Sequence, residues 1–268
     1  MADSEAMCTV VVSLAPEAPV PLLLLGVSDE FTGRPWQRPA RHWQGSALIG
    51  GLDEQAGGTW LAVHPEQSRV GCILNGRGEF APPDRRRSRG ELPLRAAAEG
   101  QAALKELYQA PETLARYDPF YLVCADLSSV LLLGWDGITA DLTELEPATH
   151  VLTNAGHMYP PGRDNLHKPP DEKAARFGPK FAASRPSGDP DPKTTLAGAW
   201  GDWLALAAGD GLAATEPGAI IVRRELPDGR IYGSTSVTLV ALAADGRLRY
   251  DFQPDPQAGG DWYRVETA

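Results

Sequence analysis

The stretch Met7-Cys8-Thr9-Val10-Val11-Val12-Ser13-Leu14 sets a cysteine at the head of an apolar run that predicts a β-strand over residues 8–14. A cysteine that is the first residue of a chain can use its own α-amine as the base that takes the thiol proton. An unperturbed thiol titrates near ~8.5 and an α-amine near ~7.7 to 8.0, so a small shift in either pKa gives thiolate at neutral pH. Cys8 is therefore a candidate nucleophile, against the alternative that a cysteine near a start codon has no role.

Residues 1–7 stand in the way of this chemistry, because removal of Met1 exposes Ala2 and leaves Cys8 internal. Two routes would free the amine of Cys8. Either residues 1–7 are a short propeptide, or translation starts at Met7, whose small neighbour Cys8 favours removal of the methionine. The nucleophile hypothesis requires one of the two.

Composition predicts one globular domain over residues 1–268. The chain is 43% hydrophobic and 22% charged, which is enough apolar material for a large core. Its 25 basic and 35 acidic residues give a net charge of −10, which argues against nucleic acid or an anionic membrane as partner. A small-molecule substrate or ligand is the expected partner. The basic run 85–89, between Pro83 and Gly90, is interpreted as a solvated loop in preference to a binding patch.

Sequence features that direct a chain across membranes are not expected here. No Lys or Arg precedes Arg34, so the charged region of a secretory signal is missing, and the apolar stretch 20–27 is too short to span a bilayer. Cys8, Cys72 and Cys124 lack the paired spacing of disulfide frameworks or zinc sites, and the last two lie in strand-like runs typical of inert buried thiols. A cytoplasmic location without a metal is predicted.

Apolar periodicity predicts an α+β fold. Short apolar segments bounded by Gly, Pro and Asp indicate strands at 8–14, 20–27, 59–64, 70–75, 120–125, 130–135, 138–142, 151–154, near Ile220, 231–242 and 248–252. Helical spacing indicates helices over 93–109 and 196–207, and the composition of 159–193 indicates a long loop or lid. This order predicts two largely antiparallel sheets packed face to face with helices outside.

Motifs spread over nearly the whole chain carry a resemblance to a known family. They are Met7-Cys8-Thr9-Val10, Val27-Ser28-Asp29-Glu30 with Arg34-Pro35 and Trp43, Gly50-Gly51-Leu52-Asp53, Gly57-Gly58-Thr59-Trp60-Leu61, Ile73-Leu74-Asn75, Leu152-Thr153-Asn154 and Tyr232-Gly233-Ser234-Thr235-Ser236-Val237-Thr238. On these motifs the chain resembles the transport and Golgi organisation family, also called the NRDE family. The resemblance implies an N-terminal-nucleophile hydrolase-like fold of four layers, αββα, related to cysteine amidases.

Three arginines of the family pattern are replaced in this chain. The residues at those positions are Ser28, Leu52 and Thr235. An arginine beside the cysteine would favour thiolate and hold an anionic substrate or a developing oxyanion. Arginines near the motifs that could take over this role are Arg34, Arg77 and Arg223.

The resemblance and the residue types together predict a catalytic site of Cys8, Asp29, Asn75 and Asn154. Asp29 would orient the ammonium of Cys8 by a charge-assisted hydrogen bond, and its alternative is a turn-forming Asp. Asn75 and Asn154 each end an apolar run, where an amide N–H can donate to an oxyanion, and their alternative is likewise a turn residue. Trp36, Trp43 and Trp60, with the glycines at 50, 51, 57 and 58, suggest an aromatic-lined cleft, although core is the commoner place for such side chains.

Two functions from different classes follow. The first is a hydrolase of C–N (amide) bonds that uses Cys8 and requires no cofactor. The alternative is a non-catalytic carrier of haem or of lipid and acyl-CoA ligands on the same fold, because the resemblance links the family to haem trafficking and lipid homeostasis. Haem would need an axial ligand, for which the candidates are Cys8, His42, His64, His150 and His157. The histidines, His167 included, lack metal or catalytic spacing and are expected at the surface.

Overall fold

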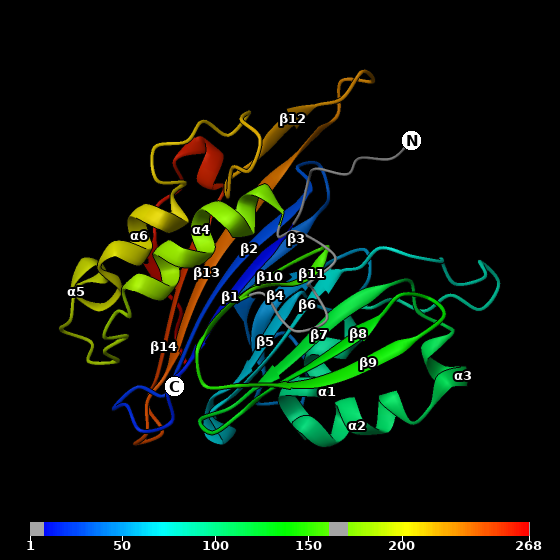
Figure 1. The fold of residues 1–268 in the computed structure, drawn as a ribbon, viewed down its shortest axis with the longest axis horizontal. Coiled ribbons are helices and arrows are strands. Elements are labelled where there is room, and N and C mark those ends of the chain that lie inside the picture. The colour runs from blue at the N-terminus through cyan, green and yellow to red at the C-terminus, as the bar shows by residue number, and fades with distance from the viewer. Residues whose placement is uncertain (1–7, 161–170, 268) are drawn as a thin grey trace.

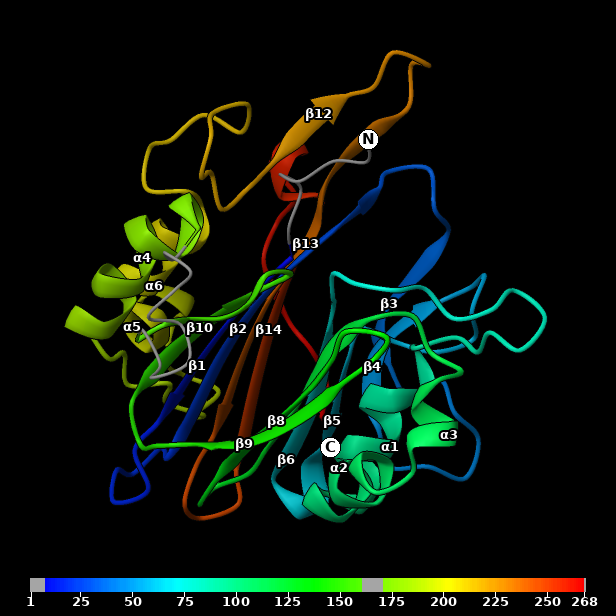
Figure 2. The same ribbon diagram turned by 45° about the vertical axis from the view of Figure 1, so that its right-hand side comes forward.

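The computed structural model describes residues 8–160 and 171–267. These residues form two β-sheets that pack face to face, with helices on both outer faces (Figure 1). The order of layers is therefore helices, sheet, sheet, helices, which is easiest to follow in Figure 2. The α+β class and the two largely antiparallel sheets predicted from sequence are confirmed. The seven N-terminal residues, which bear on the nucleophile hypothesis, lie outside the described residues.

The first sheet has eight strands in the order β11-β10-β1-β2-β13-β14-β15, with β12 paired to β13. Their bounds are β1 Thr9–Leu14, β2 Leu22–Phe31, β10 Thr149–Thr153, β11 Gly156–Tyr159, β12 Arg223–Glu225, β13 Ile231–Leu242, β14 Leu248–Pro254 and β15 Tyr263–Arg264. Strand β1 pairs antiparallel with β2 on one side and β10 on the other. Cys8 thus stands at the start of an interior strand.

The second sheet has seven strands in the order β3-β4-β5-β6-β7-β8-β9, and each neighbouring pair is antiparallel. Their bounds are β3 Trp36–Ala40, β4 Ile49–Asp53, β5 Leu61–His64, β6 Arg69–Asn75, β7 Phe120–Ala125, β8 Val130–Trp135 and β9 Ala140–Leu145. The chain runs through this sheet in sequence order, so the stretch after β6 and the residues before β7 meet at one end of adjacent strands.

Six α-helices of the described residues form the outer layers. Sheet two is covered by α1 Glu91–Glu99, α2 Gln101–Tyr108 and α3 Pro111–Leu114, and sheet one by α4 Glu172–Ala183, α5 Leu196–Trp200 and α6 Asp202–Ala207. Two 3₁₀ turns, Pro65–Gln67 and Pro256–Ala258, complete the helical elements of the described residues. Each of the two helices predicted from sequence is interrupted by a glycine with positive φ, Gly100 and Gly201. None of the helices in the described ranges has the length and apolar character needed to cross a bilayer.

The apolar run of β2 shows how the layers are held together. Leu22 and Leu24 face the other sheet, whereas Leu23 and Leu25 face the helices of the outer layer. All four side chains are fully buried. A strand covered on both faces has no polar side, which explains why this segment is uniformly apolar and does not alternate.

The prediction of a long loop over residues 159–193 is wrong for Glu172–Ala183, which form α4. Asp171 caps this helix by accepting a 2.8 Å hydrogen bond from Ala174 N. Phe177 and Phe181, one turn apart, are buried against sheet one. The Pro, Gly and Lys residues that suggested a loop include Pro179, which lies inside the helix. Residues 161–170 lie outside the described part of the chain.

Candidate functional site

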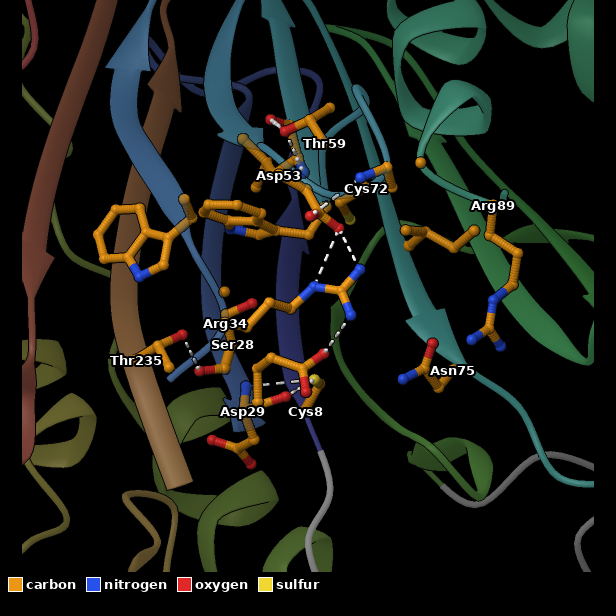
Figure 3. Close-up of a pocket in the computed structure, with 18 of the residues that line it drawn as sticks. Cys8, Ser28, Asp29, Arg34, Asp53, Thr59, Cys72, Asn75, Arg89 and Thr235 are labelled. Atoms are coloured by element: carbon orange, nitrogen blue, oxygen red, sulfur yellow. Dashed lines mark hydrogen bonds and ion pairs between the residues drawn. The ribbon is translucent and has the colours of Figure 1, made fainter. Parts of the chain in front are cut away.

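A cavity of about 390 Å³ lies between the two sheets, at one end of their strands (Figure 3). Sheet one contributes Cys8, Ser28 and Thr235 to its wall. The other sheet and its loops contribute Trp36, Trp60, Asn75 and residues 86–90. Its size is within the range of about 300–1,000 Å³ that is typical of small-molecule sites.

Cys8 lines this cavity because of the alternation of side chains along β1. Val10 and Val12 face the second sheet, so Cys8 lies on the same inner face. Asp29 N donates to its sulfur at 3.3 Å, and the thiol lies 3.5 Å from Asp29 O. Burial, together with the nearby Asp29 charge, raises the pKa of the thiol to about 12. With residue 7 attached, Cys8 is therefore a thiol at neutral pH.

Asp29 contacts Cys8 through its backbone, while its carboxylate lies on the opposite side of the sheet. Oδ1 accepts a 2.6 Å hydrogen bond from Ser234 Oγ, and Oδ2 lies 3.8 Å from Nζ of Lys173 on α4. Both members of this ion pair are almost completely buried. Burial raises the pKa of Asp29 to about 6, and the Lys173 charge opposes the shift. Asp29 is therefore a neighbour of Cys8 through its backbone, and its role toward an α-ammonium stays a prediction.

The two asparagines lie on different sides of Cys8. Asn75 ends β6 and lines the cavity from the second sheet (Figure 3). Asn154 follows β10, where the Thr9–Thr153 pairing continues to bring it beside Cys8, although it does not belong to the cavity wall. Its Oδ1 is buried and has no hydrogen-bond partner among the described residues. Their proposed roles as oxyanion donors remain predictions.

Two of the three positions where the family has arginine lie side by side in the cavity wall, on the adjacent strands β2 and β13. Thr235 Oγ1 donates to Ser28 O at 3.2 Å (Figure 3). Leu52 lies on β4 and is outside the wall. Hydroxyl groups thus occupy places beside Cys8 where cations were expected from the family pattern.

Arg34 supplies a cation to the same region of the cavity. Of the three arginines suggested as replacements, it alone belongs to the wall as described, and Arg77 and Arg223 lie elsewhere. Its Nη2 and Nε donate to Oδ2 of Asp53 at 2.6 and 3.2 Å, and Nη1 lies 3.9 Å from Glu30. The hydrogen bond to Asp53 raises the pKa of Arg34. Two carboxylates therefore share this charge.

Residues 85–89 form an exposed loop, as interpreted from sequence, but this loop also borders the cavity and only Arg89 is partly buried. Arg86, Arg87 and Arg89 line the cavity. The segment is held there by backbone contact: Thr59 N donates to Gly90 O at 2.9 Å, and a Cβ on Gly58 would lie 2.3 Å from the carbonyl carbon of Gly90. Gly58 is one of the glycines that the sequence motifs include, but its contact with Gly90 is formed only by tertiary packing and could not be predicted from sequence.

For two of the three tryptophans the structure shows the cleft that sequence suggested, although sequence favoured a core position. Trp36 and Trp60 line the cavity with their rings edge to face, 5.8 Å apart. Gly51 makes room for them, because a Cβ there would lie 2.3 Å from Cη2 of Trp60. Trp43 lies outside the wall, where its Nε1 donates to Gly57 O at 3.3 Å.

The histidines do not meet at the cavity. None of the four that the structure describes lines it, and His167 lies outside the described residues. His150 on β10 and His157 on β11 contact each other, with 3.0 Å between Nδ1 of His150 and Nε2 of His157. His150 is buried, so the expectation of surface histidines is wrong for this residue. No group of three or more metal-binding side chains occurs in the described ranges. Because none of the described histidines lines the cavity, its wall does not fit a histidine-ligated haem.

The fold and the cavity together define an α+β protein with two packed antiparallel sheets and a cysteine at the start of an interior strand, inside a small-molecule-sized pocket. The model of the family described as Transport and Golgi organisation 2 matches residues 7–178, well over half of the chain. The chain belongs to this family. The matched range includes Cys8, Asp29, Asn75 and Asn154. No match was found among curated proteins.

Proposed function

We propose that the protein is an N-terminal-nucleophile amide hydrolase in which Cys8, as the first residue of the mature chain, attacks the substrate. The observation that carries this proposal is the position of Cys8, at the start of an interior strand and in the wall of a 390 Å³ cavity. A nucleophile needs both access to substrate and a rigid support, and a strand end beside a cavity provides the two together.

Two buried acceptor atoms near the start of β1 favour a cationic α-amine on Cys8. Asp29 Oδ2, from the β2 side, and Asn154 Oδ1, from the β10 side, have no hydrogen-bond partner among the described residues. Buried acceptors are normally satisfied. An ammonium at Cys8 would stand between β2 and β10 and could donate to both, while the Asp29 charge would remain paired with Lys173.

The reaction proceeds by acyl transfer to sulfur. The thiol proton of Cys8 passes to its α-amine as Sγ bonds to the carbonyl carbon, and Asn75 and Asn154 stabilise the oxyanion. The ammonium then gives the proton to the leaving nitrogen, and the C–N bond breaks to release an amine and leave a thioester. Water adds to the thioester with its proton going to the α-amine, and the acid product leaves as Sγ recovers a proton.

The high thiol pKa explains why a free amine is part of the proposal. The pKa of about 12 describes a chain in which residue 8 is an internal amide. A charged amine on the same residue would lower it, since a nearby cation stabilises thiolate. Activity should therefore depend on the N-terminus.

Hydrolysis of octanoyl p-nitroanilide by two forms of the protein tests the proposal. One form begins at Cys8, released from a cleavable fusion, and the other retains residues 1–7. We expect turnover by the first form. In the second form turnover should be about 10²-fold lower or undetectable, because the α-amine of Cys8 that acts as the base is missing. Cys8→Ser should lower turnover further, whereas Cys124→Ser, at a buried thiol outside the cavity, is the matched control. Equal turnover by Cys8→Ser, or none by the form that begins at Cys8, would overturn the proposal.

Ligand carriage without catalysis is the second candidate, favoured by the protonated thiol and by Ser28 and Thr235 in place of cations. A carrier would bind a fatty acyl amide with the same affinity whether or not residues 1–7 are present. Binding by calorimetry that is equal in both forms, without turnover in either, would support it. For haem, a saturable Soret shift on titration with haemin that is lost in Cys8→Ser would be required, and absence of a shift would exclude it.

A further inference from the structure

One of the four arginines in the cavity wall has no carboxylate partner. Arg34 pairs with Asp53 at 2.6 Å, Arg86 with Asp118 at 3.1 Å and Arg87 with Glu91 at 2.7 Å. Arg89 is different: among the described residues, no carboxylate oxygen lies within ion-pairing distance of it. Its charge is therefore available to whatever occupies the cavity.

The guanidinium of Arg89 is fixed beside Asn75. Nη1 donates to Pro119 O at 2.6 Å, and the same oxygen accepts a 2.8 Å hydrogen bond from Gly76 N, the residue after Asn75. The side chain is partly buried, and burial lowers its pKa, while the neighbouring Asp118 and Cys8 groups oppose the shift. An arginine stays cationic under such conditions. Figure 3 shows both Arg89 and Asn75 on the wall of the cavity.

The other side of the cavity carries two tryptophans, next to the Arg34–Asp53 ion pair whose charges neutralise each other. Trp36 and Trp60 belong to the β3 and β5 side of the second sheet, and Trp36 also packs against Phe252 at 5.9 Å. Asn75 and Pro119 belong to the β6 and β7 side. A ligand that reaches from one side to the other therefore meets an aromatic surface at one end and a cation with an amide at the other.

We propose that Arg89 and Asn75 form a carboxylate-binding subsite of this cavity, and that the substrate is an acyl amide that carries a carboxylate. A guanidinium matches the two oxygens of a carboxylate, and an asparagine N–H adds a further donor. A single unpaired arginine suits a monoanion, whereas a phosphate dianion usually requires more charge. The bond that is cleaved rests on the proposed function, but the binding of the anion can be tested without it.

Binding of N-octanoylglycine and N-octanoylglycinamide, which differ in the carboxylate alone, tests the subsite. Calorimetry on the Cys8→Ser chain, where no substrate is consumed, should give at least about 10-fold tighter binding of the carboxylate, as expected of a charge-assisted pair. In the Arg89→Gln background this preference should disappear, and Arg89→Lys should keep part of it. Arg85→Gln removes the same charge from an exposed neighbour outside the cavity wall and should leave the preference intact.

A second variant guards against a loss of folding in Arg89→Gln. Asn75→Asp is nearly isosteric at an exposed strand end and should reverse the preference, because it adds a negative charge. Absence of binding, equal affinity for the two probes, or equal loss of preference in Arg85→Gln would overturn the subsite. Turnover of both probes, measured in parallel on the chain that begins at Cys8, separates the two proposals. Selective binding without turnover refutes the hydrolase alone, and unselective turnover refutes the subsite alone.

Discussion

Ser28 and Asp29, neighbours on β2, face two different environments. Ser28 lines the open cavity with Cys8, whereas the Asp29 carboxylate is sealed beneath α4 with Lys173. The period of two along a strand lets one segment serve both faces. The inner face presents the Cys8 thiol and the hydroxyl groups of Ser28 and Thr235 to the cavity. The outer face holds a buried ion pair that contributes to the stability of the fold. Mutations on the outer face should therefore lower stability, whereas mutations on the inner face should change binding or activity.

Asp29→Asn should give the largest effect on stability. The change removes the negative charge that faces the buried ammonium of Lys173, and breaking a buried ion pair typically costs about 3–5 kcal/mol. Denaturant unfolding measures it. The double variant Asp29→Asn with Lys173→Met removes both charges and should recover most of the loss. If the single variant unfolds like the parent chain, the outer face is not held by this pair.

Gly58→Ala should come next, because it acts on the backbone contact that holds the arginine segment against the inner face. A Cβ at Gly58 would overlap the Gly90 carbonyl, and overpacking of this kind costs about 1–3 kcal/mol. Binding of N-octanoylglycine should weaken as Arg89 moves. Gly33→Ala, where nothing lies within 4 Å of the added carbon, is the control and should be neutral. Equal effects at both positions would contradict the contact.

The His150–His157 pair, which lies outside the cavity wall, predicts a pH dependence of stability. Burial and the neighbouring His150 lower the pKa of His157 to about 4. Unfolded histidine takes up a proton near ~6.5, so stability is retained above that pH and falls as the pH drops toward 4, by about 1–2 kcal/mol between pH 7 and 5. The contribution of His157 is measured by comparing the free energy of unfolding at pH 7 and pH 5 in the parent chain and in His157→Gln. A variant with the same pH dependence as the parent would argue against it.

Cys8→Ser should have the smallest effect on stability and so sharpen the contrast with Asp29. The sulfur takes part in weak contacts with the Asp29 backbone at 3.3 and 3.5 Å beside a cavity. A change of no more than about 1 kcal/mol is expected in denaturant unfolding, since a hydroxyl can replace these contacts. A loss of unfolding free energy as large as that of Asp29→Asn would mean that Cys8 is a core packing residue, which would argue against its role as a nucleophile.

The parts of the fold that sequence predicted well are those in which local pattern and burial agree. The strands at 120–125, 130–135 and 231–242 are found with the predicted bounds. Strands β3 and β4 were missed because their polar and glycine-rich segments carry no apolar alternation. Helix α4 was missed because Pro179 and its charged residues suggested a loop.

The candidate site shows the same division. Cys8 and Asn75 were predicted from residue type and strand ends, and both line the cavity. The partner of Asp29, Lys173, comes from a segment interpreted as a loop. Arg89 enters the cavity through a contact between glycine backbones, which no local pattern reveals. Residues that meet only by tertiary packing were therefore beyond a reading of the sequence.

The central claim, that Cys8 is the nucleophile, is tested most directly by trapping the acyl intermediate. The chain that begins at Cys8 would be incubated with p-nitrophenyl octanoate, quenched in acid and analysed by intact mass and peptide mapping. One octanoyl group on residue 8, absent from Cys8→Ser, is the result expected. No adduct, or an adduct on Cys72, Cys124 or a surface lysine, would contradict the account.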